Sequence, residues 1–158
     1  MKALIIGFGS IGQRHYQNLN KIYKEKILIN VLRKKGKKII IKNNQIIKNK
    51  NFDNFYKGKI FKDLRTALNI KPNIVLICNP SSYHEKYIKL CIKKNIDFFV
   101  EKPALVSSKN IKFFNKEIKN KKLITMIGFQ QRFNPIIEDI KNIIRKNTLG
   151  PIINADFL

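Results

Sequence analysis

Short apolar runs alternate with amphipathic stretches along most of this chain of 158 residues. Six runs with few internal charges are typical of buried strands, at residues 2–6, 26–33, 59–61, 73–78, 97–100 and 123–127. Four stretches with helical spacing of apolar residues lie between them, at 11–23, 63–68, 81–94 and 107–120. Strands that alternate with helices form right-handed βαβ units. The sequence therefore predicts an α/β fold with a doubly wound parallel sheet.

Residues 36–58 interrupt this alternation. Two isoleucine-rich pieces, 39–41 and 46–47, flank Asn43-Asn44 and predict a short hairpin, because Asn is favoured in turns. Residues 48–58 are polar and rich in asparagine, which predicts a loop. We assign no chemistry to this segment.

A glycine turn joins the first predicted strand to the first predicted helix. Gly7, Gly9 and Gly12 form Gly-x-Gly-x-x-Gly in the order strand, turn, helix that a dinucleotide site requires. The first glycine permits the tight turn, the second lets the backbone approach a pyrophosphate, and the third lets the helix pack on the strand. The unpaired N–H groups of the helix start bind phosphate. We therefore predict a Rossmann-type NAD(P)-binding fold whose cofactor contacts include Gly7, Phe8, Gly9, Ser10, Ile11 and Gly12.

The end of the second predicted strand bears on the choice of cofactor. In such folds an acidic residue about 20 positions after the glycines accepts hydrogen bonds from the ribose 2′-hydroxyl of NAD. Here Arg33 stands 21 residues after Gly12 and is followed by Lys34, while residues 26–52 contain no Asp or Glu. A guanidinium suits a 2′-phosphate and cannot accept a hydrogen bond. Arg33 and Lys34 therefore favour NADP over NAD.

Polar residues gather at the carboxyl ends of the predicted strands, the edge at which parallel sheets bind ligands. They comprise the glycine turn, Arg33, Asn79-Pro80, Glu101-Lys102-Pro103 and Gly128-Phe129-Gln130. Their convergence predicts one ligand site along this edge.

The chain is strongly basic, with 33 Lys and Arg against 10 Asp and Glu and a net charge of +23. Such a charge is typical of nucleic-acid-binding proteins. The basic residues are, however, scattered through every segment together with an excess of Ile and Asn, and the codons of all three residue types are rich in A and T. The lysines form no recognition motif, so the sequence does not favour a nucleic-acid partner.

The two cysteines and the apolar pattern bear on disulfides, metal sites and membrane segments. Cys78 ends an apolar run and Cys91 lies in a predicted helix, as expected of buried thiols outside any disulfide or metal site. No run of 18 apolar residues is present to span a membrane, and the N-terminus lacks the continuous apolar region of a signal peptide. We therefore expect a cytoplasmic protein with no metal site.

Four segments share a pattern that extends over nearly the whole chain. They are Gly7–His15, Pro72–His84, Glu101–Leu105 and Gly128–Pro135. In order and spacing they resemble the glucose–fructose oxidoreductase / inositol dehydrogenase (Gfo/Idh/MocA) family, with Glu101-Lys102-Pro103 as the most specific part. The resemblance implies a nicotinamide-dependent oxidoreductase that acts on a sugar, a cyclitol or a related polyol.

The resemblance also implies roles for residues at the sheet edge. Lys102 is the implied catalytic residue, which lies beside the nicotinamide, orients the reacting hydroxyl and relays its proton. Glu101 and the Asn79-Pro80 turn are implied to line the nicotinamide ribose. His84 is implied to lie near the same edge among the cofactor-binding residues, and the alternative is an exposed helix residue without a role.

The family further implies a second, largely antiparallel domain that binds substrate and supplies an Asp and a His. We expect the dinucleotide-binding domain at 1–127 and, at 128–158, only the opening of the second domain, with a helix at 134–146 and a strand at 152–158. His15 and His84 are the only histidines and both fall in the first domain. We therefore expect a fragment, a decayed gene product, or a module that another polypeptide completes.

Two functional hypotheses remain, with a nucleic-acid binder as a less favoured third. The chain is either the cofactor-binding portion of an NAD(P)-dependent sugar or cyclitol oxidoreductase, or a non-enzymatic NAD(P)-binding module, including a truncated and inactive homologue. The uncovered apolar face expected on the helix at 134–146 predicts self-association as a homo-oligomer or pairing with a separate chain.

Overall fold

The computed structural model describes residues 1–34, 39–42, 45–47, 51–154 and 156. The chain divides into two compact units, Met1–Gly128 and Phe129–Leu158, which are described separately.

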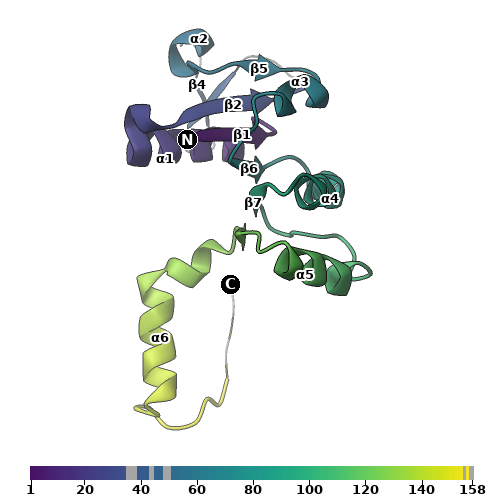
Figure 1. Cartoon of the computed structure of the whole chain (residues 1–158). Helices are drawn as coiled ribbons and strands as arrows, with labels where there is room; N and C mark the ends of the chain where they lie inside the picture. Colours follow the sequence, from purple (N-terminus) through teal and green to yellow (C-terminus); the bar gives the residue numbers. More distant parts are fainter. Residues whose placement is uncertain (35–38, 43–44, 48–50, 155, 157–158) are drawn as a thin grey trace. The chain divides into compact units, whose positions relative to one another are not determined.

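The first unit is built around a six-stranded parallel sheet (Figure 1). Its strands are β1 (Lys2–Ile6), β2 (Leu28–Leu32), β5 (Ile60–Phe61), β6 (Ile74–Ile77), β7 (Asp97–Val100) and β8 (Thr125–Ile127). They lie in the order β5–β2–β1–β6–β7–β8, and every neighbouring pair is parallel. The chain thus moves outward from β1 in one direction and from β6 in the other, which confirms the predicted doubly wound sheet.

Helices connect these strands and confirm the four predicted helical stretches. They are α1 (Ser10–Tyr23), α3 (Leu64–Leu68), α4 (His84–Lys94) and α5 (Ile111–Asn120), with short 3-10 turns η1 (Lys24–Lys26) and η2 (Ser81–Tyr83). The stretches expected at 81–94 and 107–120 become α-helical only at His84 and Ile111.

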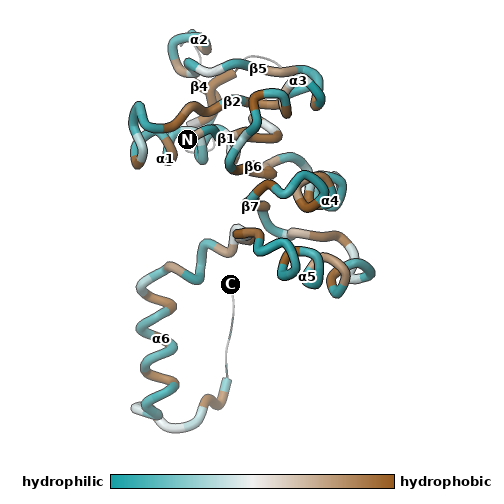
Figure 2. Tube along the Cα trace, in the orientation of Figure 1, coloured by the Kyte–Doolittle hydropathy of each residue, from teal (hydrophilic) through white to brown (hydrophobic). Residues whose placement is uncertain are grey.

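Apolar side chains cover both faces of the sheet. On β1, Leu4 belongs to the cluster that contains Cys91, and Ile5 belongs to the opposite cluster, which contains Phe8 and Tyr16. Figure 2 shows β6 and β7 as apolar segments. Both cysteines are buried free thiols, as expected, and burial raises the pKa of Cys91 to about 12.

A short hairpin lies outside the main sheet. Its strands β3 (Ile40–Lys42) and β4 (Gln45–Ile47) are antiparallel, which confirms the predicted pairing, while the predicted turn at Asn43-Asn44 lies outside the described residues. The fully buried Gln13 of α1 holds the hairpin, since its amide nitrogen donates to the Ile39 carbonyl at 2.9 Å and its oxygen accepts the Ile41 N–H at 2.8 Å.

The prediction of a loop throughout 48–58 is wrong, because the short helix α2 (Phe52–Phe55) lies within it. Phe52 and Tyr56 are buried and pack around Phe8, with ring centroids 6.0 and 5.0 Å from that of Phe8. A single helical turn is too short to show periodicity, and the helix is stabilised by aromatic contacts with a distant part of the chain.

The second unit contains η3 (Gln130–Phe133) and α6 (Pro135–Arg145). The side chain of Asn134 caps α6 by accepting the Ile136 N–H at 3.0 Å, and the helix predicted at 134–146 is confirmed. The strand predicted at 152–158 is not formed in the described residues 152–154 and 156, which have no described strand to pair with. Apolar positions recur along α6 (Figure 2), and its exposed isoleucines are Ile136, Ile140, Ile143 and Ile144.

We predict that Tyr56→Phe lowers the free energy of unfolding by about 1–3 kcal/mol, because a buried carbonyl loses its donor. The Tyr56 hydroxyl lies 3.1 Å from the Ile29 carbonyl oxygen and 3.0 Å from that of Lys59. Urea denaturation measures the loss, with Tyr23→Phe as the control at an exposed tyrosine. Equal effects of the two substitutions would contradict the prediction.

Candidate nucleotide site

The turn between β1 and α1 depends on two glycines that have no room for a side chain. Gly7 has a φ of +92°, and a Cβ placed on it would lie 2.8 Å from the backbone nitrogen of Asn79. A Cβ on Gly12 would overlap the carbonyl oxygen of Gly7. The fold itself therefore requires Gly7 and Gly12.

The third glycine, Gly9, faces open space. Nothing lies within 4 Å of the position that its Cβ would occupy, and its backbone, at φ −76° and ψ −162°, is extended. Gly9 is the N-cap of α1, where no described side chain caps the helix and the first turn carries no acid. The first N–H groups of an α-helix have no acceptor within the helix. An open cradle at this positive helix end fits the pyrophosphate of a dinucleotide.

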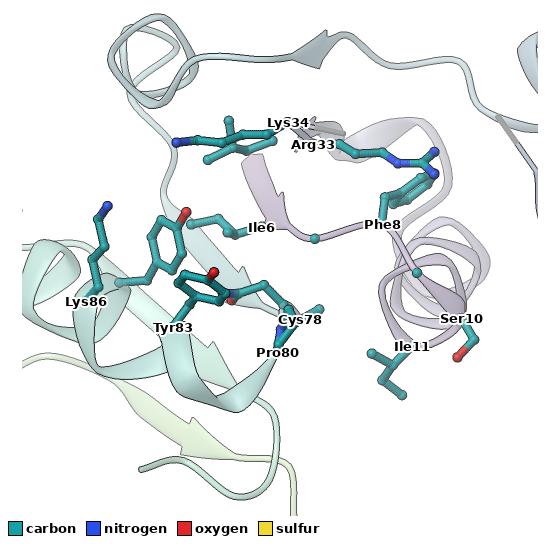
Figure 3. A pocket seen from close by; sticks show the side chains of 15 residues that line it. Ile6, Phe8, Ser10, Ile11, Arg33, Lys34, Cys78, Pro80, Tyr83 and Lys86 are labelled. Carbon is teal, nitrogen blue, oxygen red and sulfur yellow. The ribbon is translucent and has the colours of Figure 1, made fainter. Parts of the chain in front are cut away.

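In front of this turn lies a cavity of about 890 Å³ (Figure 3). It is bounded by the glycine turn, the end of β2, the turn after β6 and the start of α4. The predicted cofactor-binding residues that line it are Gly7, Phe8, Gly9, Ser10, Ile11, Arg33, Lys34, Asn79 and Pro80. Gly12, His84, Glu101 and Lys102 do not line this cavity.

The cavity is lined by cations from both sides. Figure 3 shows Arg33 and Lys34 on one wall and Tyr83 and Lys86 on the opposite wall. No acidic residue is among its described lining residues. The backbone N–H of Arg33 donates to the backbone carbonyl of Phe61 at 2.8 Å, which fixes the end of β2 at the cavity. The site therefore suits a polyanionic ligand.

Phe8 borders the cavity but is almost entirely buried. Its ring is only 2% exposed because it packs in the aromatic cluster with Tyr16 and Tyr56. This packing holds the glycine turn on the core, so Phe8 shapes the cavity from the inside.

Asn79 presents an unpaired acceptor. Its side-chain oxygen is buried and has no hydrogen-bond partner among the described residues. A buried polar atom without a partner is costly, and a hydroxyl or amide donor of a ligand would satisfy it. Asn79 is thus a second place, besides Gly9, where the structure fits a bound nucleotide.

His84 lies behind the cavity wall. The residue is 1% exposed, so the alternative of an exposed helix residue is wrong. One ring nitrogen, Nε2, lies 2.7 Å from the Asn79 carbonyl oxygen and the other, Nδ1, lies 2.8 Å from that of Pro103. Both partners are backbone carbonyl oxygens, and they belong to two separate segments of the chain. His84 therefore ties the turn after β6 to the loop after β7.

Glu101 and Lys102 follow β7, and they differ in exposure. The Glu101 carboxylate is half-buried, and its Oε1 lies 2.7 Å from Nε2 of His15, on α1. Its Oε2 accepts the Lys102 N–H at 3.3 Å. Burial and the negative charge of Glu101 together raise the pKa of Cys78, a residue of the cavity wall. The Lys102 side chain is exposed, and the Lys102–Pro103 peptide bond is cis.

Sequence reasoning missed three side chains that belong to this region. Tyr83 and Lys86 line the cavity, although the sequence pattern places them only within the helical stretch predicted at 81–94. His15 contacts Glu101 across 86 positions of sequence. A contact of this kind becomes visible only once the sheet order brings α1 and the end of β7 together.

Two further kinds of feature, a metal-binding cluster and a membrane-spanning helix, are not found among the described residues. No three His, Cys, Asp or Glu side chains among them gather to hold a metal ion. Within the same residues, none of the helices has both the length and the apolar character needed to cross a bilayer.

Known proteins with similar sequences are oxidoreductases. The chain is 28% identical to the uncharacterized oxidoreductase YrbE of Bacillus subtilis over 149 residues, which is 92% of this chain and 40% of that protein. It is 25% identical to the myo-inositol 2-dehydrogenase of Thermotoga maritima over 159 residues, or 95% of this chain and 42% of that protein. The chain thus spans less than half the length of either relative.

Solved structures show the same fold. The myo-inositol 2-dehydrogenase of Lactobacillus plantarum superposes with a TM-score of 0.75 at 22% identity, over 97% of this chain and 43% of that one. The WlbA dehydrogenase of Chromobacterium violaceum, solved with NADH and UDP-GlcNAcA, gives 0.72 at 16% identity, over 95% and 41%.

A family model gives the assignment directly. The model of GFO_IDH_MocA, described as an oxidoreductase family with an NAD-binding Rossmann fold, matches residues 1–129. That range contains the glycine turn, the cavity and Glu101-Lys102-Pro103. The chain belongs to the GFO_IDH_MocA oxidoreductase family, and residues 1–129 are its NAD-binding Rossmann domain.

Proposed function

We propose that this chain is the cofactor-binding portion of an oxidoreductase that uses NADP, in preference to NAD, to act on a sugar, a cyclitol or a related polyol. The open space at Gly9, beside the uncapped start of α1, carries the proposal. Neither the turn nor the helix explains a glycine there, whereas a pyrophosphate that approaches the backbone does.

The proposed roles are divided between residues that line the cavity and the two residues that follow β7. The first turn of α1 binds the pyrophosphate through backbone N–H groups. Asn79 offers its unpaired oxygen, and Glu101 its carboxylate, to hydroxyl donors of the nicotinamide ribose. When bound, the nicotinamide supplies hydride transfer. Lys102, exposed next to Glu101, orients the reacting hydroxyl and relays its proton.

The two relatives named as inositol dehydrogenases support the polyol substrate class. The WlbA structure contains NADH. For this chain, Arg33, Lys34 and Lys86 support NADP, because all three line the cavity and add positive charge to it.

A non-enzymatic NAD(P)-binding module is the second candidate. His15 and His84, the only histidines, are both engaged, with Glu101 and with two backbone carbonyls. Proton relay therefore depends on Lys102 in this chain. A spectrophotometric screen of sugars and cyclitols with NADP separates the candidates, since turnover that Lys102→Met abolishes requires an enzyme.

We predict that the chain binds NADPH more tightly than NADH and that Arg33→Ser reduces the affinity for NADPH about ten- to a hundredfold. One charge-assisted hydrogen bond contributes on the order of 1.5–3 kcal/mol, which corresponds to this range. Calorimetric titration with both nucleotides measures the ratio, and Lys62→Ser, at an exposed lysine, controls for net charge. An NADH preference, or equal affinities, would refute the role of Arg33.

We also predict that Gly9→Val abolishes NADPH binding and leaves the fold intact, because the new side chain enters open space where the pyrophosphate must lie. Gly12→Ala is the matched contrast and should unfold the domain, since its Cβ overlaps the Gly7 carbonyl. Thermal melts followed by circular dichroism and NADPH titration distinguish the two effects. Undiminished binding by folded Gly9→Val would remove the main support for the proposed site.

A further inference from the structure

We propose that His15 is a positioning residue that holds the Glu101 carboxylate at the nicotinamide half of the site. The inference rests on the proposed function, because it assigns Glu101 to the nicotinamide ribose. It adds a residue of α1, beyond the glycine turn, to the groups that determine how the cofactor binds.

The contact between the two side chains is short and partly shielded. His15 Nε2 lies 2.7 Å from Glu101 Oε1, and the side chains are 20% and 15% exposed. The rings of His15 and Phe99 meet in a T-shaped arrangement, with centroids 4.8 Å apart and planes at 64°. His15 is therefore fixed from one side by an aromatic ring and from the other by a carboxylate.

Further groups restrict the carboxylate on its other side. Its Oε2 accepts the Lys102 N–H at 3.3 Å. A Cβ on Gly128, which follows β8, would lie 3.1 Å from Oε2 and 3.0 Å from Cζ of Phe99. The absence of a side chain at Gly128 thus leaves the room in which Glu101 sits. Contacts from α1, β7 and the end of β8 define one position for the carboxylate.

That position adjoins the nucleotide cavity. The Glu101 N–H donates to the Ile77 carbonyl at 3.0 Å, so Glu101 lies beside the end of β6. Cys78 and Asn79, the next two residues after Ile77, line the cavity wall. The backbone of Glu101 therefore lies next to the segment that forms this part of the cavity wall.

The positive charge of Lys102 explains why the Glu101 carboxylate needs a second residue that fixes its position. Glu101 is adjacent to Lys102, whose ammonium group would attract a free carboxylate. His15 engages Oε1, which keeps the carboxylate directed toward α1 and leaves the remaining lone pairs of Oε2 for ribose hydroxyls. The contact between His15 and Glu101 thereby leaves the Lys102 ammonium available for substrate.

Two ligands separate this role from a structural one. NADPH occupies both halves of the site, whereas adenosine 2′,5′-bisphosphate occupies only the half near Arg33. We expect His15→Phe to weaken NADPH binding about tenfold and to leave the affinity for the bisphosphate unchanged. His15→Gln keeps a side-chain donor and should restore most of the NADPH affinity. Asn18→Phe, at an exposed position of α1, is the control for the added ring.

A double-mutant cycle tests whether His15 acts through Glu101. If it does, His15→Phe combined with Glu101→Gln weakens NADPH binding no more than the stronger single substitution. Additive losses, equal losses for both ligands, or no loss for folded His15→Phe would overturn the positioning role while NADPH still binds the unsubstituted chain. Failure of that chain to bind either ligand would instead overturn the proposed function, and the positioning role with it.

Discussion

The close contact between the turn after β1 and the turn after β6 is the constraint on which the site depends. The backbone of Asn79 occupies the space that a Gly7 side chain would need, and the Gly7 carbonyl occupies that of Gly12. Both contacts involve backbone atoms, so rotation of a side chain cannot relieve a clash there. The start of α1 is consequently held against the cavity wall, and the geometry of the phosphate cradle follows from the packing of the domain rather than from a ligand.

The side chains of His84 and His15 also stabilise this arrangement. His84 connects the turn after β6 to the loop after β7, and His15 connects α1 to the same loop. Each histidine joins segments that the main-chain ladders of the sheet do not join. The loop that carries Glu101 and Lys102 is therefore fixed by side chains as well as by the end of its strand.

The sequence allowed the fold to be predicted where the signal is local. The glycine pattern and the apolar runs at β1 and β6 depend on neighbouring residues, so the sheet, its helices and the cradle were predictable. The helix α2 was not, because Phe52 and Tyr56 are ordered by packing on Phe8, more than forty residues away. The burial of His84 and the contact of His15 with Glu101 could not be predicted from the sequence either, because both depend on the order of the strands.

The attachment of the β3–β4 hairpin through Gln13 has a consequence for how this domain can vary. One buried amide satisfies backbone groups of Ile39 and Ile41 from within α1, and the hairpin shares no strand pairing with the main sheet. The segment between β2 and β5 is joined to the core by this amide and also by the aromatic packing of Phe52 and Tyr56. A substitution of Gln13 would therefore leave the hairpin backbone groups of Ile39 and Ile41 without these partners, whereas the six central strands keep their pairing without it.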